Sequence, residues 1–173
     1  MATLHRSIAV SALFTLFGGP GIVLVLAPWL ITRFRVPSHE PESRIVIAAA
    51  LIVVGMIPLL ESIVRFVIVG RGTLMPLVPT EHLVVSGLYR YVRNPMYVGV
   101  LTVLAGEVLL FDSRAMMEYL ATVWLAIHLF VCFYEEGKLA RTFPDEYRRY
   151  KSHVPRWLPR LTAWRGDADG LDE

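Results

Sequence analysis

The sequence predicts an all-α integral membrane protein with about four transmembrane helices plus a C-terminal interfacial amphipathic helix. Hydrophobic residues make up 55% of the 173 residues, and the mean hydropathy is +0.52, which is too apolar for an ordinary soluble domain. The apolar residues gather in long runs without the alternation of a barrel strand. Such runs favour helices, whose backbone groups satisfy one another within lipid. We assign residues 1–165 to a single domain and residues 166–173, GDADGLDE, to a disordered acidic tail.

Four apolar segments are the predicted membrane helices. They run over Ser7–Ile31, Ile45–Val69, Met96–Phe111 and Ala115–Tyr134. At about 1.5 Å per residue, the first two can cross a hydrocarbon core of about 30 Å, and the last two can do so only if they tilt or thin it. The first segment is too long for a signal peptide and has Pro20, Pro28 and Trp29 where a cleavage site is expected, so we interpret it as a retained helix.

Positive charge predicts the orientation of these helices. With four crossings, most of the 17 lysines and arginines share one side with both termini. The opposite side carries Arg33, Arg35, Arg44 and Arg114. The positive-inside rule therefore predicts that both termini and the loop before the third helix lie in the cytoplasm. The membrane helices themselves make the lipid bilayer an expected partner. We expect no nucleic-acid partner, and no metal, because no His/Cys/Asp cluster has the spacing of metal ligands.

The polar stretch after Tyr134 carries an amphipathic pattern. Its apolar positions recur every three or four residues, at Leu139, Phe143, Tyr147, Tyr150 and Val154. This spacing predicts a helix that lies in the membrane interface, with the stripe among the lipid head groups. We expect Pro144 to break the helix and to start its second piece.

Two charged side chains and one histidine lie in the cytoplasmic half of the predicted membrane helices. Glu61 and Arg65 lie one turn apart in the second helix, and His128 lies in the fourth, at a similar depth on the cytoplasmic side. A charge in hydrocarbon is costly, so such groups face a polar cavity or one another. Two interpretations stay open for Glu61 and Arg65: a functional pair, or a pair that only neutralises itself. A structural role is likewise open for His128.

The segment GLYRYVRNPMYVG and the tail together resemble the membrane methyltransferases that include isoprenylcysteine carboxyl methyltransferase and the phospholipid N-methyltransferases. That family has a G-x-Y-x-x-x-R-[HN]-P-x-Y-x-G pattern at the start of a helix, a Glu-Glu pair at the end of the next helix, and a tyrosine-rich tail. The matching residues here are Gly87, Tyr89, Arg93, Asn94, Pro95, Tyr97 and Gly99, then Glu135 and Glu136, then FPDEYRRYKSHVPRWLP. The resemblance covers Glu81–Pro159, whereas the first two helices match only as hydrophobicity.

This resemblance implies methyl transfer from S-adenosylmethionine to a lipophilic, membrane-embedded acceptor. The acceptor could be a carboxylate, an amine or a thiol of a lipid or a prenylated compound. Two departures matter: Asn94 stands where the carboxyl methyltransferases commonly have His, and Pro144 replaces a usual Gly. Two other function classes stay open, an NADPH-dependent membrane oxidoreductase similar to the sterol reductases and a non-catalytic lipid-binding membrane protein.

Candidate site residues follow from this family pattern and from cofactor chemistry. Glu135 and Glu136 offer acceptors for the amino group and ribose diol, Arg93 offers donors for the carboxylate, and a tyrosine ring can face the sulfonium. The expected cofactor elements are residues 80–99 and 135–160, and Asn94 is expected to cap the helix that Pro95 begins. The cofactor-binding set is His82, Gly87, Tyr89, Arg93, Asn94, Pro95, Tyr97, Gly99, Glu135 and Glu136. The catalytic set is Arg93, Glu61 and Arg65, and the acceptor-binding set is Glu61, Arg65, His128 and Arg156.

Overall fold

The computed structural model describes residues 19–38, 41–68 and 83–166. Within these ranges the chain forms helices and loops and no strand, which confirms the all-α prediction. The elements are α2 (Gly19–Gly21), the π-helix η1 (Ile22–Leu26), α3 (Ala27–Thr32), α4 (Glu42–Ile68), the 3₁₀-helix η2 (Gly87–Arg90), α5 (Pro95–Phe111), α6 (Arg114–Phe130), the π-helix η3 (Val131–Glu135), α7 (Glu136–Thr142) and α8 (Pro144–His153).

Two helix boundaries agree with the sequence prediction and one does not. α5 begins at Pro95 and α8 at Pro144, because proline fits the first helical position, where its missing N–H costs nothing. The fourth segment was predicted to end at Tyr134, and this is wrong: one continuous helical run extends over Arg114–Thr142. The Glu-Glu pair therefore lies inside that run, because a change from apolar to polar side chains does not by itself end a helix. Of the first predicted segment, residues 7–18 lie outside the described residues.

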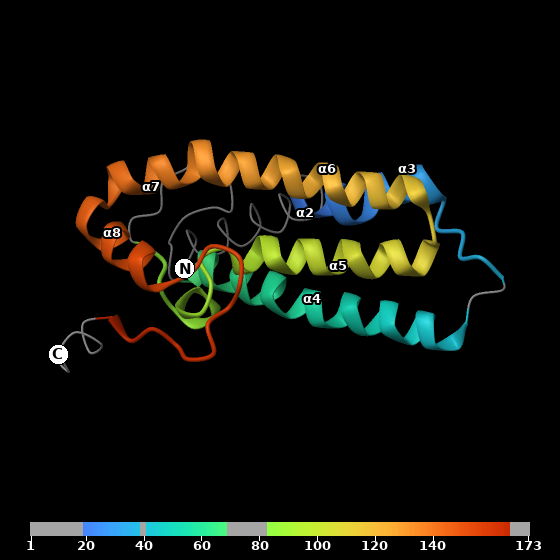
Figure 1. Cartoon of the computed structure of the whole chain (residues 1–173), viewed down its shortest axis with the longest axis horizontal. Coiled ribbons are helices and arrows are strands. Elements are labelled where there is room, and N and C mark those ends of the chain that lie inside the picture. The colour runs from blue at the N-terminus through green and yellow to red at the C-terminus, as the bar shows by residue number, and fades with distance from the viewer. Residues whose placement is uncertain (1–18, 39–40, 69–82, 167–173) are drawn as a thin grey trace, which may run out of the picture.

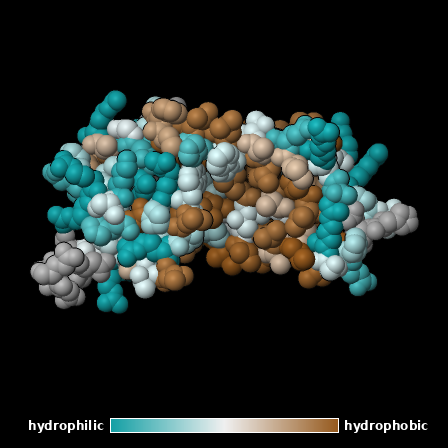
Figure 2. Space-filling view, in the orientation of Figure 1, coloured by the Kyte–Doolittle hydropathy of each residue, from teal (hydrophilic) through white to brown (hydrophobic). Residues whose placement is uncertain are grey.

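Two of these helices are long and apolar enough to cross a membrane. They cover Glu42–Arg65 and Arg114–Thr142, and the runs Gly19–Thr32 and Pro95–Phe111 are shorter apolar helices. Large apolar side chains are exposed along α4 and along the run from α6 to α7; they include Val46, Val53, Ile57, Leu60, Met117, Leu125, Leu129 and Phe133. Figure 2 shows a hydrophobic band between two hydrophilic ends. A surface of this kind suits contact with lipid.

The α4 and α5 helices lie side by side and approach closely (Figure 1). A Cβ added to Gly99 would lie 2.6 Å from the Gly55 carbonyl oxygen of α4, and one added to Gly55 would lie 2.8 Å from the Gly99 carbonyl oxygen. Glycine at both positions lets the two backbones meet. Leu59, Val103 and Leu104 are buried in the hydrophobic core next to this contact.

A polar cap (residues 83–94 and 136–166) covers one end of the bundle, where η2, α7, α8 and the chain after α8 gather (Figure 1). Tyr147, Tyr150, Val154 and Trp164 form its core and are each at most 7% exposed. The apolar stripe that was predicted to lie among lipid head groups is therefore buried against the protein. Leu139 and Phe143 complete the stripe and pack on the same core. Periodicity identified the buried face correctly but not the surface that covers it.

Candidate functional site

Gly87 brings the start of the family motif against α4. Its φ is +57°, in the left-handed region that favours glycine. A Cβ at this position would also overlap the side chains of Glu61 and Arg65. Arg65 forms an ion pair with Glu61, and its Nη1 donates to the Ser86 hydroxyl at 3.1 Å. The two charged residues of α4 thus contact the motif directly, and their contacts fix the position of the turn that leads into η2.

Arg93 connects the motif to the cap through both its backbone and its side chain. The backbone N–H donates to the Pro155 carbonyl at 2.9 Å. The Nη1 group donates to Glu136 Oε1 at 2.8 Å and to the Tyr147 hydroxyl at 3.1 Å. The Arg93 and Glu136 side chains are only 10% and 9% exposed. A buried charge-assisted pair of this kind is held rigidly, because leaving either partner unpaired is costly.

Glu136 is the centre of a cluster of basic side chains. Besides Arg93, it accepts from Arg156, whose Nε lies 2.5 Å from Oε1 and whose Nη2 lies 3.0 Å from Oε2. Lys151 Nζ lies 3.2 Å from Oε2. The hydrogen bond to Glu136 raises the pKa of Arg156 above its usual value. Three cations therefore neutralise one carboxylate, and this cluster joins the segment before α5 to α7, α8 and the chain after α8.

Glu135 faces a different set of groups. The Tyr97 hydroxyl donates to Glu135 Oε2 at 3.3 Å. The Tyr89 phenol lies within electrostatic range of both Glu135 and Glu61, and it interacts with the buried Ser62 of α4. Burial raises the pKa of Tyr89, so the phenol stays protonated and can donate a hydrogen bond. Carboxylates and phenols from α4, η2, α5 and η3 thus converge here.

Two buried charged side chains of this region each have an atom without a hydrogen-bond partner among the described residues, Glu61 Oε2 and Arg93 Nε, and the buried Ser62 Oγ has none either. Buried polar groups in native proteins are nearly always paired, so an unpaired acceptor and an unpaired donor call for a partner that the chain does not supply. One is an anion on α4 and the other a cation at the start of α5. A cationic or proton-donating group would satisfy the first, and an anionic group would satisfy the second.

Asn94 and His128 make contacts that the sequence did not indicate. Asn94 precedes α5 at the expected capping position, but its side chain makes no cap hydrogen bond. Its Nδ2 donates instead to the Arg156 carbonyl at 3.1 Å. His128 accepts from Trp157 Nε1 at 3.2 Å through Nδ1 and stacks on Trp124. His128 therefore holds the chain after α8 against α6.

Comparison with known proteins assigns a family to this arrangement. The family model described as phospholipid methyltransferase matches residues 43–146, which is more than half of the chain. The chain belongs to the phospholipid methyltransferase family. The match includes Glu61, Arg65, Arg93, Glu135 and Glu136, and it extends over α4, where the sequence alone indicated only hydrophobicity.

Two curated relatives of this phospholipid methyltransferase family member match about half of the chain. The cobalt-zinc-cadmium resistance protein CzcN of Cupriavidus metallidurans is 34% identical over 86 residues, which are 50% of this chain and 39% of that protein. The phosphatidylethanolamine N-methyltransferase of Eremothecium gossypii is 33% identical over 88 residues, which are 50% of this chain and 10% of that protein. The chain thus spans less than half the length of either relative. No solved structure matches it.

The family motif residues separate into two groups in the structure. Tyr89, Tyr97 and Glu135 face the interior near Glu61, whereas Arg93, Asn94, Glu136 and Arg156 join the cap to α5. Gly99 packs against α4, and His82 lies outside the described residues. Among the described residues, no group of three or more His, Cys, Asp or Glu side chains could hold a metal ion.

Several contacts of the site were missed by sequence reasoning: those of Ser62, Ser86, Tyr147, Lys151 and Trp157. Tyr147 was counted only as a member of the apolar stripe, although a tyrosine in such a stripe brings a hydroxyl that needs a partner when buried. Serine and lysine at the other positions are ordinary in loops and helix ends. Their spacing along the chain carries no signal of the contacts they make.

Proposed function

We propose that this chain transfers a methyl group from S-adenosylmethionine to a lipophilic acceptor that reaches the site through the bilayer. Membership of the phospholipid methyltransferase family supports lipid methylation in general. The observation that carries the proposal is the convergence of Glu135, Tyr97 and Tyr89 with Glu61 at the start of α5. Acidic and aromatic groups in this arrangement suit a cationic cofactor and exclude water from the methyl group.

The residues present fit the cofactor, and the two glutamates take different parts. Glu135 would accept from the amino group or ribose diol, and the rings of Tyr89 and Tyr97 would face the positive sulfur. The unpaired Arg93 Nε would donate to the carboxylate. Glu136, which already binds three cations, would position Arg93 and not contact the cofactor. When bound, S-adenosylmethionine supplies an electrophilic methyl group.

Glu61 and Arg65 are the candidate acceptor-side residues. Glu61 Oε2 is buried and has no hydrogen-bond partner among the residues that the structure describes. It can take a proton from an amine acceptor, whereas a carboxylate acceptor needs no base. Arg65 holds Glu61 in place and connects it to Ser86. Because His128 is occupied by Trp157, we place the acceptor beside Glu61 and not beside α6.

The topology in this proposal has four crossings, with both termini and the polar cap in the cytoplasm. The two long apolar helices and the apolar band of Figure 2 support membrane insertion. Single cysteines at Ser152 and Ser38, introduced on a Cys132→Ala background, should label from the cytoplasmic side and from the outer side respectively. Labelling of both positions from the same side would overturn this topology.

The decisive experiment measures transfer itself. The full chain, purified and reconstituted in lipid nanodiscs, is incubated with S-adenosylmethionine labelled in its methyl group and with a membrane lipid extract. We expect label in the lipid fraction, and the chemistry of the labelled product identifies the acceptor as an amine, a carboxylate or a thiol. Saturable binding of NADPH without binding of S-adenosylmethionine would favour a reductase instead. Binding of neither would favour a non-catalytic lipid-binding protein.

A further inference from the structure

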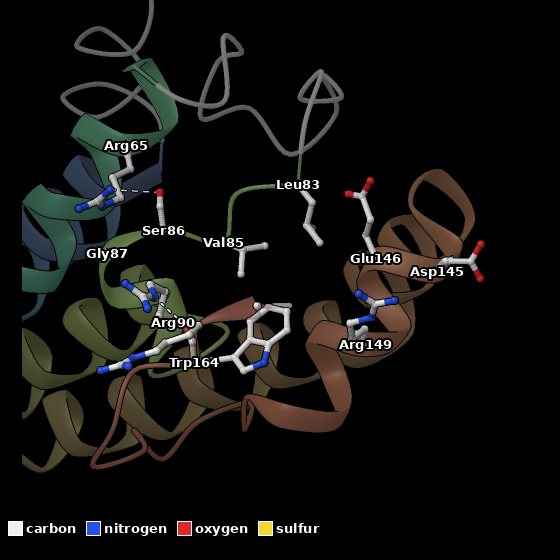
Figure 3. A pocket seen from close by; sticks show the side chains of 12 residues that line it. Arg65, Leu83, Val85, Ser86, Gly87, Arg90, Asp145, Glu146, Arg149 and Trp164 are labelled. Carbon is white, nitrogen blue, oxygen red and sulfur yellow. Dashed lines mark hydrogen bonds between the residues drawn. The ribbon is translucent and has the colours of Figure 1, made fainter. Parts of the chain in front are cut away.

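A pocket lies in the polar cap, apart from the cluster around Glu136. It has a volume of 870 Å³, and arginines from four segments line it: Arg65 of α4, Arg90 of η2, Arg149 of α8, and Arg165. Figure 3 shows Arg65, Ser86 and Arg90 on one side, Arg149 on the opposite side, and the Trp164 ring between them. Guanidinium groups from parts of the chain this far apart meet only because the cap is folded.

Two of these arginines keep unused hydrogen-bond donors. Arg65 uses Nε for Glu61 and Nη1 for Ser86, and Arg90 uses Nε for the Trp164 carbonyl at 2.5 Å. An arginine carries five N–H donors, so each guanidinium has others left that make no hydrogen bond to the described residues. Planar guanidinium groups of this kind bind phosphate and carboxylate oxygens in pairs. Asp145 and Glu146 also line the pocket, on the α8 side with Arg149. The Arg65 and Arg90 guanidinium groups are therefore the part of the pocket that suits an anion.

Layers of aromatic side chains separate this pocket from the cluster around Arg93 and Glu136. The Trp164 ring packs on Tyr150 with centroids 5.7 Å apart, and Tyr150 packs on Tyr147 with centroids 6.4 Å apart. The Tyr150 hydroxyl donates to the Tyr89 carbonyl at 2.6 Å, which closes the layer against η2. Arg93 and Glu136 lie on the other side, in contact with Tyr147. The aromatic layer thus lies between the pocket and the Arg93–Glu136 cluster, whereas Arg65 lines the pocket and also contacts Glu61.

We propose that this pocket binds the phosphate of a structural phospholipid, one that is not the methyl acceptor, and that Arg65 is shared between the pocket and the acceptor side of the transfer site. Arg65 lies in the last turn of α4, whose 27 residues extend about 40 Å, longer than a hydrocarbon core of about 30 Å. This places the pocket at the level of the head groups, where phosphate is the commonest anion. The bound phosphate would link α4 to α8 through Arg65, Arg90 and Arg149 and so hold the cap on the membrane.

The test uses the full chain in a neutral maltoside detergent and measures binding without methyl transfer. Its failure is therefore a separate result from failure of the methyltransferase proposal. Trp164 lines the pocket, so its emission reports occupancy once the signal of a Trp164→Phe variant is subtracted. The probes are dihexanoyl phosphatidylglycerol and inorganic phosphate. The variant is Arg149→Gln with Arg165→Gln, and the matched control is Arg141→Gln with Arg160→Gln, which removes the same charge outside the pocket.

We expect the Trp164 emission to change saturably as the lipid is added. The lipid affinity should be at least tenfold weaker in the pocket variant and within twofold of wild type in the control. Displacement of the lipid by inorganic phosphate would assign recognition to the phosphate group itself. If the protein binds inorganic phosphate but not the lipid, the bound phosphate does not come from a phospholipid, and the proposal is wrong. If the lipid affinity falls equally in both variants, the effect comes from net charge alone, and the proposed site is wrong. Competition by S-adenosylmethionine would show that the pocket belongs to the transfer site. If the double variant unfolds, Arg149→Gln against Arg141→Gln gives the same comparison.

Discussion

Glu135 and Glu136 are consecutive residues of one helical run, but their carboxylates lie in two different environments. Glu136 accepts hydrogen bonds from Arg93 and Arg156 and forms an ion pair with Lys151, so three cations surround its one negative charge. Glu135 accepts from the Tyr97 hydroxyl and faces the interior near Tyr89. Successive side chains of a helix point about 100° apart, so a pair of acids can serve two sides of one helix. The acidic pair is thus one motif in sequence and two sites in structure.

This contrast separates two kinds of contribution. Both carboxylate oxygens of Glu136 are hydrogen-bonded or ion-paired, so substitution of Glu136 should lower the stability of the cap. Near Glu135 lie polar atoms without a hydrogen-bond partner in the part of the chain that the structure describes, Glu61 Oε2 among them, so substitution of Glu135 should change binding and transfer. The following substitutions test that division, from the largest expected effect to the smallest.

Glu136→Gln should destabilise the fold by about 3 kcal/mol, because it leaves buried Arg93 without its counter-charge. The measurement is the free energy of unfolding in detergent. The matched control is Glu118→Gln on the same helical run, where the Arg114–Glu118 pair is largely exposed and should contribute less than about 1 kcal/mol. If Glu136→Gln leaves the stability unchanged but weakens cofactor binding, Glu136 contacts the cofactor and does not only hold the cap.

Glu61→Gln combined with Arg65→Met should lower methyl transfer at least about a hundredfold, or about 2.7 kcal/mol, with cofactor affinity near wild type. The double change removes both charges and leaves no unpaired ion. Ser86→Ala is the control, since it removes the Arg65 contact to the motif and keeps both charges. If Ser86→Ala loses as much transfer as the double variant, the pair only positions the motif. Full transfer by the double variant would make the pair structural.

Glu135→Gln should weaken S-adenosylmethionine binding by about 1.5 to 3 kcal/mol, the scale of a hydrogen bond to a charged group. Its stability should stay within about 0.5 kcal/mol of wild type, because the amide can still accept from Tyr97. Calorimetric titration measures the affinity, and thermal unfolding measures the stability. Affinity equal to wild type would exclude Glu135 from the cofactor site.

Tyr97→Phe and Tyr147→Phe remove the two phenols that contact the acidic pair and its partner Arg93. Each substitution should cost about 0.5 to 1.5 kcal/mol. The cost should appear in the free energy of cofactor binding for one variant and in the free energy of unfolding for the other. Tyr97→Phe should weaken cofactor binding, because the phenol orients Glu135. Tyr147→Phe should lower stability alone, because the hydrogen-bond partner of its hydroxyl among the described residues is Arg93, which it helps to hold against Glu136. If both variants weaken cofactor binding equally, the proposed difference between the roles of Glu135 and Glu136 is wrong.

The amino-acid sequence alone determined the features that depend on neighbouring residues. Hydrophobicity predicted the all-α class and α4, and proline chemistry predicted the starts of α5 and α8. The resemblance in the Gly87–Gly99 motif and in the acidic pair also indicated the family that the comparison then showed. These signals are local: a proline or an apolar run acts on the few residues around it.

Tertiary structure alone decided how these elements divide the site. Glu136 meets Arg156, 20 residues away, and the Tyr150 hydroxyl meets the Tyr89 carbonyl, 61 residues away. The π-helix Val131–Glu135 continues the helix past its predicted end and so sets the direction of both glutamates. The stripe from Leu139 to Val154 is buried in the cap because Trp164 and Leu83 cover it. Such pairings depend on which surfaces pack together, and spacing along the chain does not specify them.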